Sequence, residues 1–217
     1  MSEYPRILSV GEAAFTVEFG DAVDAALNRQ VHALDAALCA RPVPGLMETV
    51  PTYRSLLVMY ALLTSSADAM RAALWNVLDA LVTADAPASR LVEIPTHYGG
   101  AWGPDLADVA AHCGLSADAV IELHAQPVYT VAMLGFAPGF AYLLGLPEAL
   151  ATPRLATPRL RVPVGSVGIA GAQTGVYALE TPGGWRIIGR TDLALFDPAR
   201  EAPFALRAGD RVRFVPC

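Results

Sequence analysis

A segment of closely spaced glycines is the feature that most constrains how this chain can fold. Residues 162–191 read VPVGSVGIAGAQTGVYALETPGGWRIIGRT, with seven glycines and no charged residue before Glu180. Glycine inside a strand marks a bulge, a sharp bend or a close approach of the backbone to a ligand. The segment therefore predicts short strands that either turn the corners of a small barrel or expose bare backbone to a bound molecule.

Neither of the common phosphate-binding loops fits these glycines. A P-loop requires a lysine, and the chain contains none. A dinucleotide-binding loop requires a helix after the glycines, whereas GVYALETPGGW is typical of a strand and a turn. The polar residues between the glycines are Ser166, Gln173 and Thr174. Gln173 and Thr174 are expected either to present an amide and a hydroxyl to a ligand or to form a turn.

Arginines surround the glycine segment. Residues 1–150 carry 6 arginines and 16 acidic residues, whereas residues 151–217 carry 9 arginines and 5 acidic residues. The planar guanidinium group matches carboxylate and phosphate groups. We expect Arg159, just before the segment, and Arg190, near its end, to be either surface residues or the two sides of one anion-binding pocket.

The overall composition excludes several classes of protein. The formal net charge is −6 and the sequence pI is about 5.1, which argues against binding to nucleic acid or to an anionic membrane. A cationic region on an acidic chain favours a small anionic ligand or an acidic partner. Three scattered cysteines do not form a disulfide framework or a metal site, and the first residues do not resemble a secretory signal. We therefore expect a cytoplasmic protein without a bound metal.

Residues 125–147 form a long uncharged stretch, AQPVYTVAMLGFAPGFAYLLGLP. Its length would allow a membrane span, but Pro138 and the glycines around it would break such a helix. Two buried segments joined by a turn are the preferred prediction. Phe136 and Phe140 are expected to belong to a packed hairpin, to the wall of an apolar pocket or to a partner-binding surface.

The remaining pattern predicts an α+β chain of two domains. Strand, helix, two strands, helix and strand are expected over 5–19, 21–40, 47–60, 66–82 and 90–98, which is the ferredoxin-like order. Short helices are expected at 103–114 and 116–125, followed by the short strands of a barrel. The predicted domains are 1–85 and 86–217, with the small polar residues 83–89 as a linker. His124, at a predicted helix end, is kept as a possible acid or base.

Several long motifs together resemble a known family. They are GPDLADVAAHCGLS, GFAPGFAYL and the run PRLRVPVGSVGIAGAQTGVY followed by TPGGWRIIGRT. The sequence is similar to the B subunit of bacterial ATP-dependent 5-oxoprolinase, a family also called allophanate hydrolase subunit 1 or the sporulation kinase inhibitor family. The resemblance covers roughly residues 90–217. The family commonly has Ala, Pro and Pro where this chain has Val164, Ala178 and Asp192, which affects only local loop shape.

This resemblance implies a fold and a function. It implies a ferredoxin-like domain followed by a cyclophilin-like β-barrel, although no isomerase motif is present. It also implies a protein that pairs with the homologous C subunit and acts with the A subunit of the same complex. The complex would use ATP and Mg²⁺ to open the lactam of 5-oxo-L-proline to L-glutamate. We expect an arginine, Arg159 or Arg190, to hold the substrate carboxylate, and Gln173 with Thr174, or Ser166, to meet the amide.

Two other functions remain open at the level of the sequence. The chain could be a binding protein that inhibits a sensor histidine kinase through the apolar surface at 136–147. It could also be a subunit of an amidohydrolase that acts on allophanate or a urea derivative. One barrel could serve all three functions.

Overall fold

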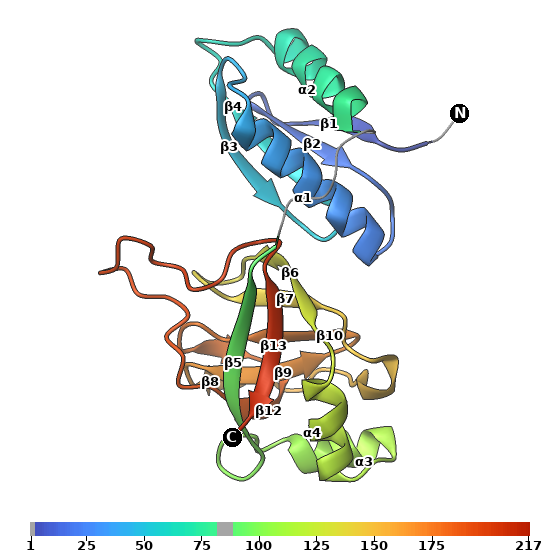
Figure 1. Ribbon diagram of the computed structural model, residues 1–217, viewed down its shortest axis with the longest axis vertical. Coiled ribbons are helices and arrows are strands. Elements are labelled where there is room, and N and C mark those ends of the chain that lie inside the picture. Colours follow the sequence, from blue (N-terminus) through green and yellow to red (C-terminus); the bar gives the residue numbers. More distant parts are fainter. Residues whose placement is uncertain (1–2, 82–88) are drawn as a thin grey trace. The chain divides into compact units, whose positions relative to one another are not determined.

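The chain forms two compact units, each with a hydrophobic core of its own. The computed structural model describes residues 3–81 and 89–217 (Figure 1). The units comprise Met1–Ala88 and Ser89–Cys217. The domain boundary predicted between residues 85 and 86, and most of the predicted linker, lie outside the described residues. The predicted α+β class with a barrel in the second unit is confirmed.

The first unit is an antiparallel sheet with two helices packed on one face (Figure 1). Its strands lie in the order β1-β2-β4-β3. Alternating residues such as Phe15 and Val58 are buried toward the helices, where Leu34 and Leu74 complete the core. The elements are β1 (Arg6–Val10), β2 (Ala14–Glu18), α1 (Ala25–Ala40), β3 (Leu46–Pro51), β4 (Ser55–Tyr60) and α2 (Ala67–Leu81).

The order of elements along the chain in this unit differs from the predicted ferredoxin-like order. Residues 5–19 form a hairpin of two strands, because Gly11 adopts a positive φ of 60° between them. The first helix begins after Asp24, whose carboxylate accepts hydrogen bonds from the backbone N–H groups of Ala26 and Leu27. The strand expected at 90–98 forms, but it belongs to the barrel of the second unit.

The second unit is a closed barrel with the strand order β10-β7-β6-β13-β5-β12-β9. A separate two-stranded sheet pairs β11 with β8. The strands are β5 (Leu91–Tyr98), β6 (Tyr129–Leu134), β7 (Ala141–Leu144), β8 (Arg159–Val162), β9 (Ser166–Ala170), β10 (Gln173–Val176), β11 (Thr181–Gly183), β12 (Arg186–Arg190) and β13 (Arg211–Pro216). The glycine-rich segment thus supplies β11 and three strands of the barrel, β9, β10 and β12, which confirms that it helps to build a barrel.

Two helices lie next to each other in this unit, α3 (Leu106–Cys113) and α4 (Ala117–Ala125) (Figure 1). Each helix has a clear capping residue at one end. Gly114 ends α3 with a positive φ of 68°, and the Ser116 hydroxyl accepts a hydrogen bond from the N–H of Ala119 at the start of α4. A short 3-10 turn, η1 (Glu148–Leu150), follows β7.

The uncharged stretch 125–147 passes from the end of α4 through β6, a Pro-Gly turn and β7. In the part of the chain that the structure describes, no helix is long and apolar enough to cross a membrane. The two buried segments and the turn expected there are therefore confirmed.

Candidate functional site

A small pocket opens beside the barrel where β7, β10 and β11 come close to the loop before β8. Its volume is about 210 Å³, below the ~300–1,000 Å³ of sites for drug-sized ligands. We call it the aromatic pocket, because five aromatic side chains line it: Phe136, Phe140, Tyr142, Tyr177 and Trp185. Its size and lining fit a small molecule with an apolar ring.

Phe140 lies at the centre of these rings. Its centroid is 4.7 Å from that of Tyr142, 4.9 Å from that of Tyr177 and 5.4 Å from that of Trp185, and each pair meets edge to face. Such pairs are favourable beyond the area that they bury. Phe140, Tyr177 and Trp185 are almost fully buried, so the packing of the chain itself holds these three rings in place.

The TPGGW stretch forms another wall with bare backbone. Gly183 and Gly184 both line the pocket, next to Pro182. A Cβ atom on Gly183 would collide with the hydroxyl oxygen of Tyr177. Close approach of backbone to a pocket, one of the two roles expected for the glycines, is therefore found at 183–184 rather than among Ser166, Gln173 and Thr174.

One positively charged side chain lies at the pocket without a carboxylate partner among the described residues. Arg154 lines the pocket, and its guanidinium carbon lies 5.9 Å from the centroid of the Trp185 ring. The nearby Arg159 and Arg186 bind Asp105 and Asp108, with N···O distances of 2.6 Å and 3.1 Å. Across residues 3–81 and 89–217, no carboxylate lies within ion-pair distance of Arg154, so its charge is available to an anion.

The pocket also offers two protonated phenols. Burial raises the pKa of Tyr177 to about 12 and raises the pKa of Tyr142 above its ordinary value. The positive charge of Arg154 partly opposes the rise in the pKa of both tyrosines. Near neutral pH both tyrosines therefore keep a proton to donate. A guanidinium, two phenols and apolar rings together can bind a small carboxylic acid that carries a second polar group.

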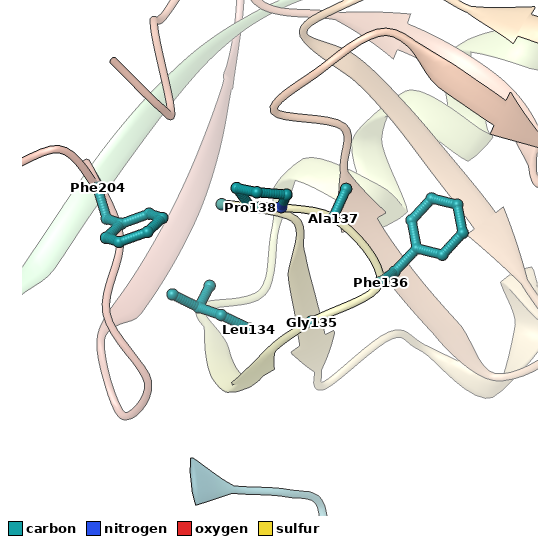
Figure 2. A pocket seen from close by; sticks show the side chains of 7 residues that line it. Leu134, Gly135, Phe136, Ala137, Pro138 and Phe204 are labelled. Carbon is teal, nitrogen blue, oxygen red and sulfur yellow. The ribbon is translucent and has the colours of Figure 1, made fainter. Parts of the chain in front are cut away.

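Two of the residues expected at a site, Phe136 and Phe140, do line this pocket. Phe136 is 63% exposed and has a positive φ of 63°, which is costly for a residue other than glycine. A second hollow of about 320 Å³, which we call the apolar hollow, lies along the same loop. Figure 2 shows Leu134, Pro138 and Phe204 around it, with the Phe136 ring pointing away from Phe204.

The polar residues expected to meet a substrate are not brought together at this pocket. Arg159 directs both terminal nitrogens at Asp105, with distances of 2.9 Å and 2.6 Å. The face of its guanidinium that would hold a substrate carboxylate is thus occupied by a carboxylate of the chain itself. Arg190 lies with its guanidinium carbon 5.1 Å from the ring of Trp102 and does not line the pocket.

Ser166 and Thr174 are buried and bonded within the barrel. The Ser166 hydroxyl donates to the carbonyl of Pro163 at 2.7 Å, which ties the turn before β9. The Thr174 hydroxyl donates to the carbonyl of Gly168 at 3.1 Å. Gln173 begins β10 opposite Ala170 in the hairpin with β9. The barrel interior therefore accounts for the hydroxyl contacts of Ser166 and Thr174, whereas a ligand contact of the Gln173 amide stays a prediction.

His124 belongs to the same interior network. Its Nε2 lies 2.9 Å from the Thr174 hydroxyl and its Nδ1 lies 2.8 Å from the Tyr98 hydroxyl. Because Thr174 already donates to Gly168, Nε2 carries the proton and Nδ1 accepts from Tyr98. Burial lowers the pKa of His124 to about 3. The imidazole is neutral and enclosed, so its role as acid or base is not supported.

The pattern of the sequence did not single out Arg154, Tyr142, Tyr177 and Trp185. Arg154 lies in the first copy of the duplicated pentapeptide ATPRL, which gave no reason to separate it from the neighbouring arginines. The acidic partners of Arg159 and Arg186 lie more than fifty residues away in the chain. Only the folded chain shows which guanidinium keeps its charge free for a ligand.

Comparisons with known proteins agree on one family. Residues 5–206 match the family described as carboxyltransferase domain, subdomain C and D. The chain is 50% identical over 214 residues to the 5-oxoprolinase B subunit of Escherichia coli O157:H7, covering 97% of this chain and 95% of that protein. It is 42% identical over 220 residues to the 5-oxoprolinase B subunit of Bacillus subtilis strain 168, covering 97% and 92%.

A solved structure shows the same fold within a longer protein. The crystal structure of TTHA0988 is 43% identical, with a TM-score of 0.83 over 94% of this chain. The match covers 40% of TTHA0988, so this chain spans less than half the length of that relative.

Proposed function

Because the chain belongs to the family of 5-oxoprolinase B subunits, we propose that it is a non-autonomous component of an ATP-dependent 5-oxoprolinase. The complex opens the lactam of 5-oxo-L-proline to L-glutamate. The chain acts in the cytoplasm with the homologous C subunit and with the A subunit. Its three cysteines are free thiols, in keeping with a reducing compartment.

The proposed contribution of this chain is to hold the lactam in the aromatic pocket. Arg154 binds the substrate carboxylate, since it is the guanidinium at the pocket whose charge has no carboxylate partner in the described chain. The edges of Phe140 and Trp185 contact the apolar part of the ring. The phenol of Tyr177 or Tyr142 donates a hydrogen bond to the lactam oxygen. The free charge of Arg154 is the observation that carries this proposal.

In this complex, ATP and Mg²⁺ bind to another component. The chain has no lysine for a P-loop, and its described residues hold no group of three His, Cys, Asp or Glu side chains that could bind a metal ion. ATP supplies the phosphoryl group that activates the lactam oxygen when the complex is assembled. The residues of this chain bind and orient the lactam, and the rigid aromatic wall excludes water from it.

The length of TTHA0988 supports the proposed partnership. In that protein, the segment similar to this chain is joined covalently to further sequence that makes up more than half of the molecule. A covalent fusion and a complex of separate chains are two ways to keep the same domains together. We therefore expect this chain to associate stably with at least one of its two proposed partners.

The test is an assay of 5-oxoproline-dependent ATP hydrolysis by the complex reconstituted from all three proteins. Arg154→Ala is expected to raise KM for 5-oxoproline by about tenfold or more, since a charge-assisted hydrogen bond to the carboxylate is lost. Arg161→Ala is the matched control, because Arg161 is highly exposed and pairs only loosely with Glu180 at 3.6 Å. Equal KM values for the two variants would remove the pocket from substrate binding.

A second candidate function rests on the apolar hollow (Figure 2). Its lining of Leu134, Pro138 and the half-exposed Phe204 is a surface that a partner protein can cover. The candidate is a binding protein that inhibits a sensor histidine kinase. If Phe204→Ser abolishes kinase capture while the complex hydrolyses 5-oxoproline normally, this function is separate from the first. An assay with allophanate and urea in place of 5-oxoproline tests the third possibility, another amidohydrolase.

A further inference from the structure

A larger hollow lies in the first unit, between α1 and α2. Its volume is about 560 Å³, within the ~300–1,000 Å³ typical of small-molecule sites. We call it the helix groove. Its floor is formed by Phe19 and Leu78, both buried, and Trp75 lines its side with 39% of its surface exposed. An apolar floor and an accessible indole are present before any ligand binds.

The spacing of residues on α1 explains why a hollow remains there. Ala26, Arg29, Gln30 and Ala33 line the groove, and their spacing of three, four and seven residues places them on one side of the helix. The two alanines fill little of the space beside α2. At 1.5 Å per residue these positions extend over roughly 10 Å, the length of a small amphipathic molecule.

The groove presents one positive and one negative side chain that no other described residue pairs with. Arg29 on α1 and Asp79 on α2 both line it. Within the described ranges, neither side chain forms an ion pair or a hydrogen bond, with the other or with a third residue. Arg6 and Arg54 of the same unit, by contrast, are engaged: Arg6 binds Glu18 at 2.7 Å, and Arg54 donates to the carbonyl of Gly20 at 2.6 Å.

We propose that the helix groove binds an α-amino acid with an apolar side chain. The carboxylate of the ligand binds the guanidinium of Arg29, and its ammonium group binds the carboxylate of Asp79. The side chain of the ligand lies against Trp75 and the floor. An acidic amino acid binds more weakly, because its second carboxylate would lose water against apolar residues. This site is separate from the lactam pocket and does not depend on the function proposed for it.

The first experiment titrates the full-length chain with three probes and follows the fluorescence of Trp75. The chain has three tryptophans, and Trp75→Phe supplies the blank that removes the signal of the other two. L-Leucine carries both charges, N-acetyl-L-leucine lacks the ammonium group and L-leucinamide lacks the carboxylate. We expect saturable binding of L-leucine and about tenfold weaker binding of each of the other two.

Charge variants then assign each contact. Arg29→Ala is expected to weaken L-leucine about tenfold and to leave L-leucinamide unchanged, because that probe has no carboxylate to lose. Asp79→Asn is expected to weaken L-leucine similarly and to leave N-acetyl-L-leucine unchanged. Arg41→Ala and Asp21→Asn are the matched controls: both residues are exposed, neither lines the groove, and neither variant should change any titration.

All four substitutions are at exposed positions, so far-ultraviolet circular dichroism should show the same fold for each variant. The proposal is overturned if L-leucine gives no saturable Trp75 signal up to its solubility limit. It is also overturned if the three probes bind equally, or if the groove variants and the control variants bind L-leucine alike. None of these results bears on hydrolysis of the lactam, which is measured separately.

Discussion

Arg159 donates hydrogen bonds to Asp105 from both terminal nitrogens of its guanidinium group, at 2.9 Å from Nη1 to Oδ2 and 2.6 Å from Nη2 to Oδ1. Asp105 is 4% exposed, and its Oδ2 also accepts the backbone N–H of Ile187 at 2.6 Å. The pair thus joins the start of α3, β8 and β12. It also decides which arginine is left for a ligand, because it removes Arg159 from that role.

We predict that Asp105→Ala lowers the free energy of unfolding by roughly 3 kcal/mol, since it leaves a buried N–H and a guanidinium without their acceptor. Urea denaturation of the isolated chain measures the change. Asp108→Ala is the control: its pair with Arg186 is at the surface, where Asp108 is 65% exposed, and the expected cost is below about 1 kcal/mol. Equal costs for both variants would show that the buried pair is not structural.

The buried His124 makes the free energy of unfolding depend on pH. In the fold the pKa of His124 is about 3, whereas in an unfolded chain it is near 6.5. Between these values the unfolded chain binds more protons, so the stabilising effect is complete above about pH 6.5 and is lost as pH falls toward 3. We predict a slope of at most about 1.4 kcal/mol per pH unit in urea unfolding across this range.

The variant His124→Gln separates this effect from the other titrating groups. Glutamine keeps a donor for Thr174 and an acceptor for Tyr98 but has no proton to gain, so the slope should flatten. His112→Gln, at an exposed position on α3, should keep the slope of the parent. A parent slope unchanged by His124→Gln would refute the assignment of the acid dependence to this residue.

Local signals in the sequence were sufficient for most of the fold. Apolar alternation, helical spacing and the caps at Ser116 and Gly114 are short-range features, and the structure shows the elements that they predict. Local signals did not predict the hairpin at Gly11, nor that the strand at 91–98 belongs to the barrel. The pairing of β5 with β13 joins residues more than a hundred positions apart, and apolar alternation is the same in either sheet.

The site could be predicted only as far as its apolar part. Phe136 and Phe140 were expected from the aromatic residues around a Pro-Gly turn, and they do line the pocket. The charged part depends on ion pairs between residues that are far apart in the sequence. Asp105 and Asp108 neutralise Arg159 and Arg186, and Arg154 is left without a carboxylate partner among the described residues. The polar residues between the glycines predicted a ligand contact at Thr174 instead. In the closed barrel this side chain is buried.

Two neighbouring glycines allow a matched test of the aromatic pocket. Gly183→Ala would drive a methyl group into the hydroxyl of Tyr177, whereas in Gly184→Ala the nearest atom, Cγ of Pro158, lies at 3.6 Å. We predict that Gly183→Ala reduces kcat/KM of the reconstituted complex for 5-oxoproline by more than about tenfold, because Tyr177 must leave its place. Gly184→Ala should stay within a factor of about two. The prediction is wrong if both variants have the same kcat/KM for 5-oxoproline.

Because Phe136 has a positive φ, two substitutions at this position can separate the strain of its backbone from the function of its ring. This backbone conformation costs a residue with a Cβ atom roughly 1–2 kcal/mol, which glycine avoids. Phe136→Ala keeps the strain and loses the ring contacts with Phe140 and Tyr177, at centroid distances of 5.5 Å and 6.4 Å. We therefore predict that Phe136→Gly unfolds at higher urea concentration than Phe136→Ala, with a difference of about 1 kcal/mol. Both variants should lose affinity for the lactam to the same extent, since both lack the ring. A glycine variant less stable than the alanine variant would show that the conformation is not strained.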